Sequence, residues 1–495
     1  MFRSIPYKWL VATAFVLALF MEILDMTVLN TALPILGEHF DAPTSTLQWL
    51  VTGYLVSLAV FIPVSGWVAD RFGDKNTFVL ALVIYTAASL WAGFAGSVTE
   101  LLIARVTQGV GGGLLTPVGT ALLFRAFPPH ERARASAILA IPTTLAPALG
   151  PVLGGWLADN ISWRWVFLLK VPIGVFALVF SVLALRAGEK TARERLDVLG
   201  FLTGGAGLAT LLVGLERGAR EGWSDRPTLA LVGAGLLLVA AFVVTERRVR
   251  HPMIDLALLG NRMFRLGNLL LMPAAGATMG ALFVVPLMVQ GSMGLSATES
   301  GLLTMWQAFG MLLLLPFTNR VFQRVGPRRM LAGGFTAITL SQIGLATVDA
   351  DTTLWVIRGS MFVMGMAGAF IMVPVQAAAF STITPLETAR ASALFSTTRQ
   401  VAASVGVALL ATTLTVRLAD HLAALAPGAT QAARTAASFA AYQDVFVVSA
   451  IVAALGVALA LAVRDDEAAA SRGRAPSPAR AQAPSDPALE TAEAS

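Results

Sequence analysis

PPHERARASA, residues 128–137, reappears as TPLETARASA at residues 384–393, with the run Ala-Arg-Ala-Ser-Ala intact in both copies. Three glycines recur at the same spacing: Gly109, Gly112 and Gly150 match Gly365, Gly368 and Gly406. At a spacing three residues shorter, Arg105 matches Arg358, and the arginine and glycine of residues 71–73 match those of residues 324–326. Internal similarity on this scale predicts two halves of similar structure.

The chain is unusually apolar. Of its 495 residues, 56% are hydrophobic and only 13% are charged, and its mean hydropathy is +0.74. Soluble domains are about half apolar and a quarter charged. Continuous apolar runs of about 20 residues, long enough to cross a bilayer, recur along most of the chain. Because backbone in lipid must form its hydrogen bonds within helices or closed barrels, these runs predict an all-α integral membrane protein.

We predict fourteen transmembrane helices: two six-helix bundles that are pseudo-repeats of each other, plus two helices inserted between them. The predicted spans are residues 10–34, 46–69, 77–97, 101–125, 135–158, 164–185, 198–216, 228–245, 266–290, 299–319, 330–348, 354–381, 392–416 and 443–463. The corresponding divisions are an N-terminal bundle at 1–190, the inserted pair with its flanking loops at 191–262, a C-terminal bundle at 263–463 and a disordered cytoplasmic tail at 464–495. In the Ala-rich stretch 418–442 we expect a short surface helix on the outer side.

The positions of lysine and arginine set the expected orientation. If the N-terminus is cytoplasmic, more than half of the 35 basic residues fall in cytoplasmic connections, such as residues 125–134 and 320–329. The positive-inside rule therefore places both termini in the cytoplasm. The same rule accounts for the net charge of +6, so a nucleic-acid partner is not needed to explain it.

Several function classes lack their required side chains. The absence of cysteine excludes disulfides, thiolate metal sites and cysteine nucleophiles. The 4 histidines fall in or beside loops, and no H-E-x-x-H, G-x-S-x-G or G-K-[ST] pattern occurs. We therefore expect neither an enzyme, nor an ATP-driven pump, nor a bound metal or cofactor. Parallel halves favour transport through a cavity that opens alternately to each side, with a structural or sensor protein of the same fold as the alternative.

Two acids lie inside the first predicted span. In FMEILDMTVLN, residues 20–30, Glu22 and Asp25 are three residues apart and share one helix face. Arg105, near the outer end of the fourth span, would cost about 2.5–3.5 kcal/mol in hydrocarbon without a partner or water. Both acids are candidate partners for it. A carboxylate alone in lipid stays protonated, so a neutral acid with a structural hydrogen bond is the alternative, more for Glu22 than for Asp25.

A charged connection follows the second span. GWVADRFGDKN, residues 66–76, lies in a predicted cytoplasmic loop. Gly66 and Gly73 allow close approach of the backbone. Asp70 can cap a helix, and Arg71 and Lys75 can pair across the loop. We expect these charges to hold the two bundles together until the cytoplasmic side opens; an ordinary charged turn is the alternative.

The fifth span contains APALGPVLGG, residues 146–155, which is rich in proline and glycine. Prolines remove backbone hydrogen bonds and bend helices, and small residues let neighbouring helices approach. We expect a kinked, closely packed gating helix here; a kink that is merely tolerated is the alternative. The residues concerned are Pro147, Gly150, Pro151, Gly154 and Gly155.

Together these motifs resemble the major facilitator superfamily, in particular its 14-helix drug:proton antiporter branch, the multidrug efflux permeases. The resemblance is carried by LDMTVLNTALP (24–34), GWVADRFGDK (66–75), LLIARVTQG (101–109), ALGPVLGG (148–155), SWRWVFLLKVPIG (162–174), HPMIDLALLGNRMF (251–264) and STTRQVAASVG (396–406). It covers nearly everything except the tail.

The sequence departs from the family's motifs at three positions. Asp74 stands where the loop motif usually has a base, which weakens the expected contact between bundles. Ala146 replaces a glycine of the antiporter motif, and Lys170 stands where the branch usually has an asparagine.

The resemblance implies a proton-coupled antiporter in a bacterial cytoplasmic (inner) membrane that exports lipophilic, cationic or neutral drugs by alternating access. Glu22, Asp25 and Arg105 would couple transport to protons. A proton from outside would neutralise the acid and displace the drug, and its loss to the cytoplasm would restore drug binding. The alternative within transport is an exporter of one dedicated metabolite, lipid or natural product. Some relatives work with a periplasmic adaptor protein, which is therefore a candidate partner.

Two further groups complete the expected site. Apolar bulk mixed with a few polar groups suits varied ligands, although ordinary helix packing is the alternative for each such residue. The expected substrate cavity is formed by Asn30, Asn268, Met272, Trp306 and Gln307. The expected intramembrane bases are Lys170, which could alter the preferred substrate charge, Arg358 and Arg399. For Arg399 we favour a gating or interhelix role over substrate contact.

Overall fold

The fold was obtained as a computed structural model, and every regular element in the part of the chain that it describes is helical. The described residues are 5–42, 44–187, 197–223, 225–249, 252, 254–384, 386–426 and 428–464. The predicted tail therefore lies outside the described residues, apart from Arg464.

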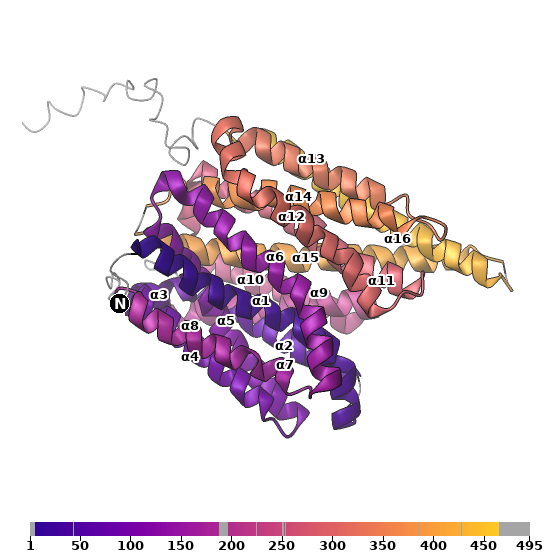
Figure 1. The fold of residues 1–495 in the computed structure, drawn as a ribbon, viewed down its shortest axis with the longest axis horizontal. Helices are drawn as coiled ribbons and strands as arrows, with labels where there is room; N and C mark the ends of the chain where they lie inside the picture. The colour runs from indigo at the N-terminus through magenta and orange to yellow at the C-terminus, as the bar shows by residue number, and fades with distance from the viewer. Residues whose placement is uncertain are drawn as a thin grey trace, which may run out of the picture.

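The first half of the chain forms one bundle, drawn from indigo to magenta in Figure 1. Its helices are α1 (Tyr7–Phe40), α2 (Thr44–Phe61), α3 (Ser65–Phe72), α4 (Asp74–Gly93), α5 (Val98–Ala126), α6 (Arg132–Asn160), α7 (Trp165–Leu168) and α8 (Lys170–Ala184). Its central packing joins α1 to α6, α4 to α5 and α2 to α5.

The remaining helices form the inserted pair and the second bundle. The pair is α9 (Val198–Glu221) and α10 (Arg226–Arg248), which pack against each other. The second bundle contains α11 (Arg262–Gly291), α12 (Ala297–Val325), α13 (Pro327–Leu345), α14 (Leu354–Ala379), α15 (Thr388–Ala423) and α16 (Gln431–Leu461). Two short 3₁₀ turns, Pro129–Glu131 and Leu256–Gly260, lie in connections.

Each predicted span is matched by a helix or by a pair of helices. The second span is α2 and α3, which meet at a bend of 55°. Pro63 lies in this break and removes a backbone donor. The sixth span is α7 and α8; Pro172 cannot bond to the carbonyl of Leu168, which accounts for the break before Lys170. One proline in each of these two spans therefore divides a predicted helix in two.

Among the described residues, ten helices are long and apolar enough to cross a membrane, or eleven with the bent α2–α3 pair. Fourteen membrane crossings therefore remain a prediction. α5, α6 and α13 are also at least 18 residues long but are not among these ten. In α5, most residues from Arg105 to Phe124 are buried against other helices, so this helix need not present an apolar surface to lipid.

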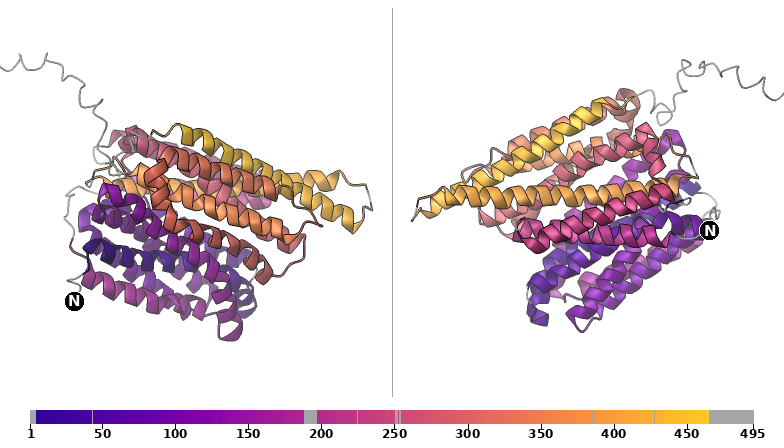
Figure 2. Two further views of the ribbon diagram at one scale, coloured as in Figure 1. Left: turned by 45° about the horizontal axis from the view of Figure 1, so that its top comes forward. Right: turned by 180° about the vertical axis from the view of Figure 1, so that it is seen from behind.

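The inserted pair contacts both halves. Seen from behind in Figure 2, α9 and α10 run along the boundary between the purple and orange bundles. On the α2 side, Thr52 donates to Glu216 at 2.7 Å; on the α15 side, the Trp223 indole donates to Thr412 at 2.6 Å. In the turn between α9 and α10, a hydrogen bond from Arg217 lowers the pKa of the Asp225 carboxyl.

The expected surface helix in residues 418–442 is not a separate element. α15 continues to Ala423 and α16 already begins at Gln431, so the two helices extend into a hairpin. Its tip projects beyond the other helices in Figure 1. Alanine has the highest helix propensity, which explains why the helices do not stop at the expected ends of their apolar runs. Within this hairpin, Asp444 on α16 accepts a hydrogen bond from His421 on α15 at 2.9 Å.

Candidate functional site

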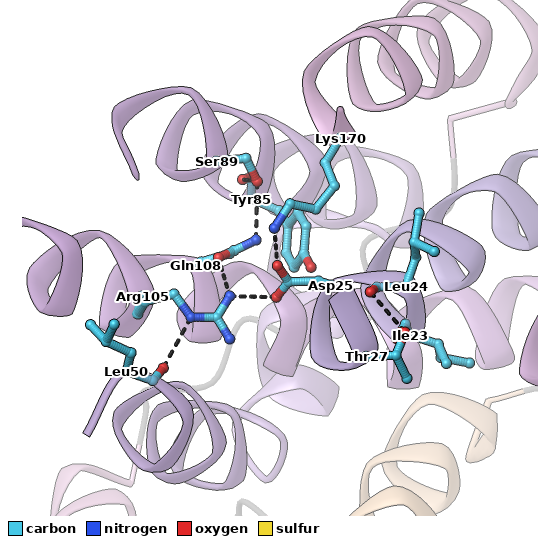
Figure 3. A network of polar contacts seen from close by, with 10 residues as sticks. All are labelled: Ile23, Leu24, Asp25, Thr27, Leu50, Tyr85, Ser89, Arg105, Gln108 and Lys170. Atoms are coloured by element: carbon cyan, nitrogen blue, oxygen red, sulfur yellow. Dashed lines mark hydrogen bonds and ion pairs between the residues drawn. The ribbon is translucent and has the colours of Figure 1, made fainter. Parts of the chain in front are cut away.

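The two acids of α1, Glu22 and Asp25, lie in different surroundings. Asp25, fully buried on α1, lies between two cations: its Oδ2 is 2.5 Å from Arg105 of α5, and its Oδ1 contacts the Lys170 ammonium of α8 (Figure 3). Arg105 and Lys170 are each only 1% exposed. We call these three residues the Asp25 network. It unites two predicted coupling residues with a base that the sequence analysis assigned to no partner.

Arg105 is held by several groups besides Asp25. Its Nε donates to the Leu50 carbonyl at 3.0 Å, and another nitrogen donates to Gln108 at 2.7 Å. Its guanidinium lies over the Tyr54 ring, 4.4 Å from the centroid. Gln108 is fixed in turn by Ser89 at 3.0 Å. α2 and its own helix therefore satisfy the buried guanidinium, while Ser89 of α4 holds Gln108, and these contacts fix the position of Arg105 against α1.

Lys170 is held much less. Among the described residues, Asp25 is the only ion-pair or hydrogen-bond partner that its ammonium has. Its other neighbour is the Phe167 ring, 4.9 Å from Nζ. The helix break before α8 places Lys170 in the first turn of that helix, where the dipole does not favour a cation. The position of Lys170 therefore depends on Asp25.

Glu22 does not pair with Arg105. Its carboxylate accepts from Thr116 on α5 at 2.7 Å. The positive charge of Arg399, on α15 in the second half, also acts on Glu22. Glu22 therefore faces the boundary between the halves, whereas Asp25 is enclosed within the first half.

The 66–76 segment contacts the second half, as expected. Asp70 lies 3.2 Å from Arg390 of α15, and we call this pair the clasp. A Cβ on Gly66 would lie 3.2 Å from the Arg390 Cα, so glycine lets the two backbones approach here. The same end is closed further by Phe124, which stacks on Phe380 at 4.7 Å, and by Ser392, which donates to the Pro117 carbonyl.

The remaining loop residues differ from the expected pairing. Gly73 forms the turn before α4 with φ of 85°. Lys75 does not pair across the loop; its ammonium donates to the Val182 and Leu185 carbonyls at the end of α8. The exposed Arg71 lies on α3.

Asp74, which departs from the family's loop motif, has a partner. Its carboxylate forms an ion pair with Arg125 at the end of α5. Asp74 is buried, and it lies at the N-terminus of α4, where a negative charge is favoured. The departure at Asp74 therefore belongs to an ion pair within the first half, and the clasp forms beside it.

The proline and glycine segment lies in α6 and packs closely against α1. Gly150 of α6 faces Thr27 of α1, and a Cβ there would lie 1.9 Å from the Thr27 hydroxyl. Gly154 is buried and Pro147 is half-buried in the same helix. Pro151 and Gly155 belong to α6, but their surroundings lie outside the described side chains.

The expected cavity residues do not gather around the Asp25 network in the described structure. Asn268 is buried and donates to the Phe264 carbonyl of its own helix at 2.9 Å. Met272 is 41% exposed on α11. Trp306 packs on Phe309 and Trp355, which makes it part of an aromatic cluster, and its neighbour Gln307 is half-buried. The Asn30 side chain lies outside the described part.

Arg358 sits beside that cluster, with its guanidinium 4.8 Å from the Trp355 ring centroid. Within the residues that the structure describes, no group of acids and histidines could hold a metal ion.

Some contacts of the site were not anticipated from sequence. Arg390 lies in the repeated segment and could have been singled out by that repetition. Gln108 follows Arg105 by one helical turn, which is a usable signal. For Tyr54, Arg125 and Thr116 the sequence offers none, because their contacts join helices that are distant in the chain.

Comparison with known proteins adds to this geometry. The model of a family described as Major Facilitator Superfamily matches residues 15–407 and 266–491. The multidrug resistance protein B homolog of Mycobacterium tuberculosis (strain CDC 1551 / Oshkosh) is 35% identical over 404 residues, covering 81% of this chain and 75% of that protein. The multidrug export protein EmrB of Escherichia coli (strain K12) is 30% identical over 416 residues, covering 83% and 80%.

Solved structures share the fold at low identity. The human organic anion transporter MFSD10 aligns with a TM-score of 0.64 at 15% identity, over 91% of this chain and all 100% of that one. The proton:xylose symporter XylE aligns with a TM-score of 0.57 at 16% identity, over 90% of this chain and 94% of that one.

Proposed function

This chain belongs to the major facilitator superfamily, whose members are multi-pass membrane transporters of small molecules and not enzymes, and we propose that it exports lipophilic, cationic or neutral drugs in exchange for protons. The observation that carries the proposal is the Asp25 network: a carboxylate buried between two cations inside a bundle of spanning helices. Ionisable groups at this depth are costly and mark proton or substrate pathways.

Drugs are proposed as cargo because of the relatives. Two proteins of 30% identity or more are named for multidrug resistance or export, and they align with most of this chain. The lincomycin resistance protein LmrB of Listeria monocytogenes, at 27% identity, aligns with 93% of it. Exposed Met272 and the aromatic cluster at Trp306 supply adaptable apolar surface of the kind that varied ligands need.

The proposed cycle is alternating access. The clasp and the Phe124–Phe380 stack close the end that we predict to be cytoplasmic, while at the other end the tips of the two bundles point apart in Figure 1. Opening the predicted cytoplasmic end requires the Asp70–Arg390 pair to separate. Proton binding in the Asp25 network on the outer side, with Glu22 as a second acid, releases cargo; proton loss inside restores binding. The membrane potential adds about 2.3 kcal/mol per charge per 100 mV to this exchange.

The proposed setting is the bacterial cytoplasmic (inner) membrane, with both termini in the cytoplasm. The positive-inside distribution supports this orientation. A periplasmic adaptor is a candidate partner that the outer hairpin of α15 and α16 would meet first.

The test is efflux of ethidium from cells expressing wild type, Asp25→Asn or Glu22→Gln at matched membrane levels. We expect Asp25→Asn to abolish efflux that an uncoupler also abolishes, and Glu22→Gln to reduce it. Unchanged gradient-driven efflux in both variants would contradict the coupling assignment. A panel of substrates in everted vesicles decides the breadth of cargo, since transport of a single compound would indicate a dedicated metabolite exporter.

A further inference from the structure

We propose that Lys170 is the group that loads and unloads the coupling proton, while Asp25 stays ionised as a fixed counter-charge, so that a proton and a monovalent lipophilic cation exclude each other at one site. This inference rests on the proposed function, and it specifies an atom, Nζ of Lys170, and a substrate class. It starts from the unequal way in which the two cations of the Asp25 network are held.

The network contains one anion and two cations. With Asp25 ionised and both cations charged, this enclosed cluster carries one net positive charge. Protonating Asp25 would raise the net charge to two and leave Lys170 without a partner. Removing a proton from Lys170 would lower the net charge to zero. Because unbalanced charge is costly in a buried site, the second change is the favourable way for the network to vary its proton content.

The two cations differ in whether they can take this role. A guanidinium does not release its proton in proteins, whereas an ammonium can when it is buried. Arg105 would keep the Leu50 carbonyl, Gln108 and the Tyr54 ring whatever happens at Lys170. A neutral amine at Lys170 could still donate to Asp25, while Arg105 continues to balance the carboxylate. Every other contact of the network survives the loss of this proton.

Among the described residues, no proton acceptor other than Asp25 is in direct contact with the Lys170 ammonium. α8 packs against α1, α4 and α7. The titratable or charged side chains that Figure 3 shows around Lys170 are Asp25 on α1, Tyr85 on α4 and Arg105 on α5. The region also contains Glu22 on α1, Tyr54 on α2, whose ring lies against Arg105, and the Phe167 ring on α7. Glu22 is directed to Thr116 and the second half, so it belongs to a separate surrounding.

Exchange at Lys170 consists of one protonation and one deprotonation of Nζ. On the outer side a proton from water bonds to the lone pair of neutral Nζ, and the new ammonium takes up the negative potential of Asp25. A bound cation then leaves, because cation and ammonium together would give the site two uncompensated positive charges. On the inner side the N–H bond breaks, the amine keeps the electron pair, and the proton passes to cytoplasmic water. A cation can then bind.

The experiment measures proton release when tetraphenylphosphonium binds to the purified full chain in weakly buffered detergent solution, with a pH-indicator dye. Wild type is expected to release protons on binding. Lys170→Asn has no proton to release, so it is expected to bind the cation at least as tightly and release none. Lys170→Arg keeps a permanent charge, so weaker binding and no release are expected. Lys190→Asn, at a lysine between α8 and α9 in the sequence, is the matched control and should behave as wild type.

Proteoliposomes provide the second measurement. Exchange of tetraphenylphosphonium without a gradient should persist in Lys170→Asn, whereas accumulation driven by a pH gradient should fall to the level of empty liposomes. Proton release or gradient-driven accumulation equal to wild type in Lys170→Asn would overturn the inference and leave the proposed antiport intact. Loss of cation binding in that variant would also overturn it, since a neutral side chain there should bind. If wild type itself shows no gradient-driven transport, the proposed function fails and takes this inference with it.

Discussion

Arg105 and Arg358 occupy equivalent positions in the two halves of the repeat, yet in the described part of the chain only Arg105 has a carboxylate partner. Arg105 meets Asp25 of α1, whereas α11, the second-half equivalent of α1, contains no acidic residue, and Arg358 stacks on Trp355 instead. The same basic residue therefore serves an ion-pair network in one half and an aromatic surface in the other. This difference places the proposed proton chemistry in the first half.

The connecting segments differ in the same way. Asp70 and Asp74 of the first half correspond to Gln323 and Pro327 of the second. Asp70 forms the clasp with Arg390, but Arg134, the repeat equivalent of Arg390, lies over the Trp9 ring at 4.7 Å. Among the described residues, one clasp thus replaces the two ion pairs that a symmetric repeat could form, and it has to separate together with the Phe124–Phe380 stack for opening at this end.

The largest loss of efflux is expected from a substitution at Arg105, the arginine that has the carboxylate partner. In Arg105→Ala, Asp25 loses its better-anchored partner, and removing one member of a buried ion pair costs about 3–5 kcal/mol. We expect gradient-driven efflux of ethidium to fall by about a hundredfold or more. Efflux rates from cells with matched protein levels measure this, with Arg105→Lys as the charge-retaining control. Efflux within twofold of wild type would show that Asp25 does not depend on Arg105.

The second prediction concerns the ion pair that has no counterpart in the second half. Asp74→Arg places two cations together at Arg125, and we expect a loss of about 2 kcal/mol and a Tm lower by several degrees. The double variant Asp74→Arg with Arg125→Asp should recover most of the loss. Thermal unfolding of the purified protein in detergent measures both. A double variant no better than the single ones would mean that the contact adds little.

The third prediction tests the clasp against its missing equivalent. Arg390→Asp should make the predicted cytoplasmic end open more often, by about fivefold, since a partly exposed pair contributes about 1 kcal/mol. The chain has no cysteine, so a single Ala393→Cys at this contact reports opening through its rate of maleimide labelling. Arg134→Asp, the equivalent change, should leave the rate unchanged. Faster labelling should be reversed by adding Asp70→Arg; if it persists, the pair is not the contact that holds this end closed.

The smallest expected effect is at Arg358. Because its described contact is the Trp355 ring, Arg358→Ala should change efflux by less than about twofold, in line with an exposed cation–π contact of about 0.5–1 kcal/mol. The same efflux assay applies. A loss as large as that of Arg105→Ala would mean that the two halves share the coupling chemistry, which would contradict its assignment to the first half.

The sequence predicted the helical fold from its apolar runs, and from the cost of a buried cation it predicted Glu22 and Asp25 as candidate partners for Arg105, of which the structure pairs only Asp25 with it. It did not pair Lys170 with Asp25, because spacing along the chain is silent about contacts between α1 and α8. It also missed the two helix breaks at Pro63 and Pro172, since hydropathy continues through both. The extended α15 and α16 were missed because alanine continues a helix without being strongly apolar.

The inserted pair has a mechanical consequence. α9 is tied to α2 through Glu216, and the chain just beyond its end is tied to α15 through Trp223. Glu216 and Trp223 contact opposite halves and are only a few residues apart. While both hydrogen bonds persist, α9 and α10 cannot move as a rigid body with either half alone. When α2 and α15 separate, one of these two hydrogen bonds must break or the outer end of α9 must bend. The lengths of the Glu216 and Trp223 side chains therefore limit how far α2 and α15 can separate while both bonds persist.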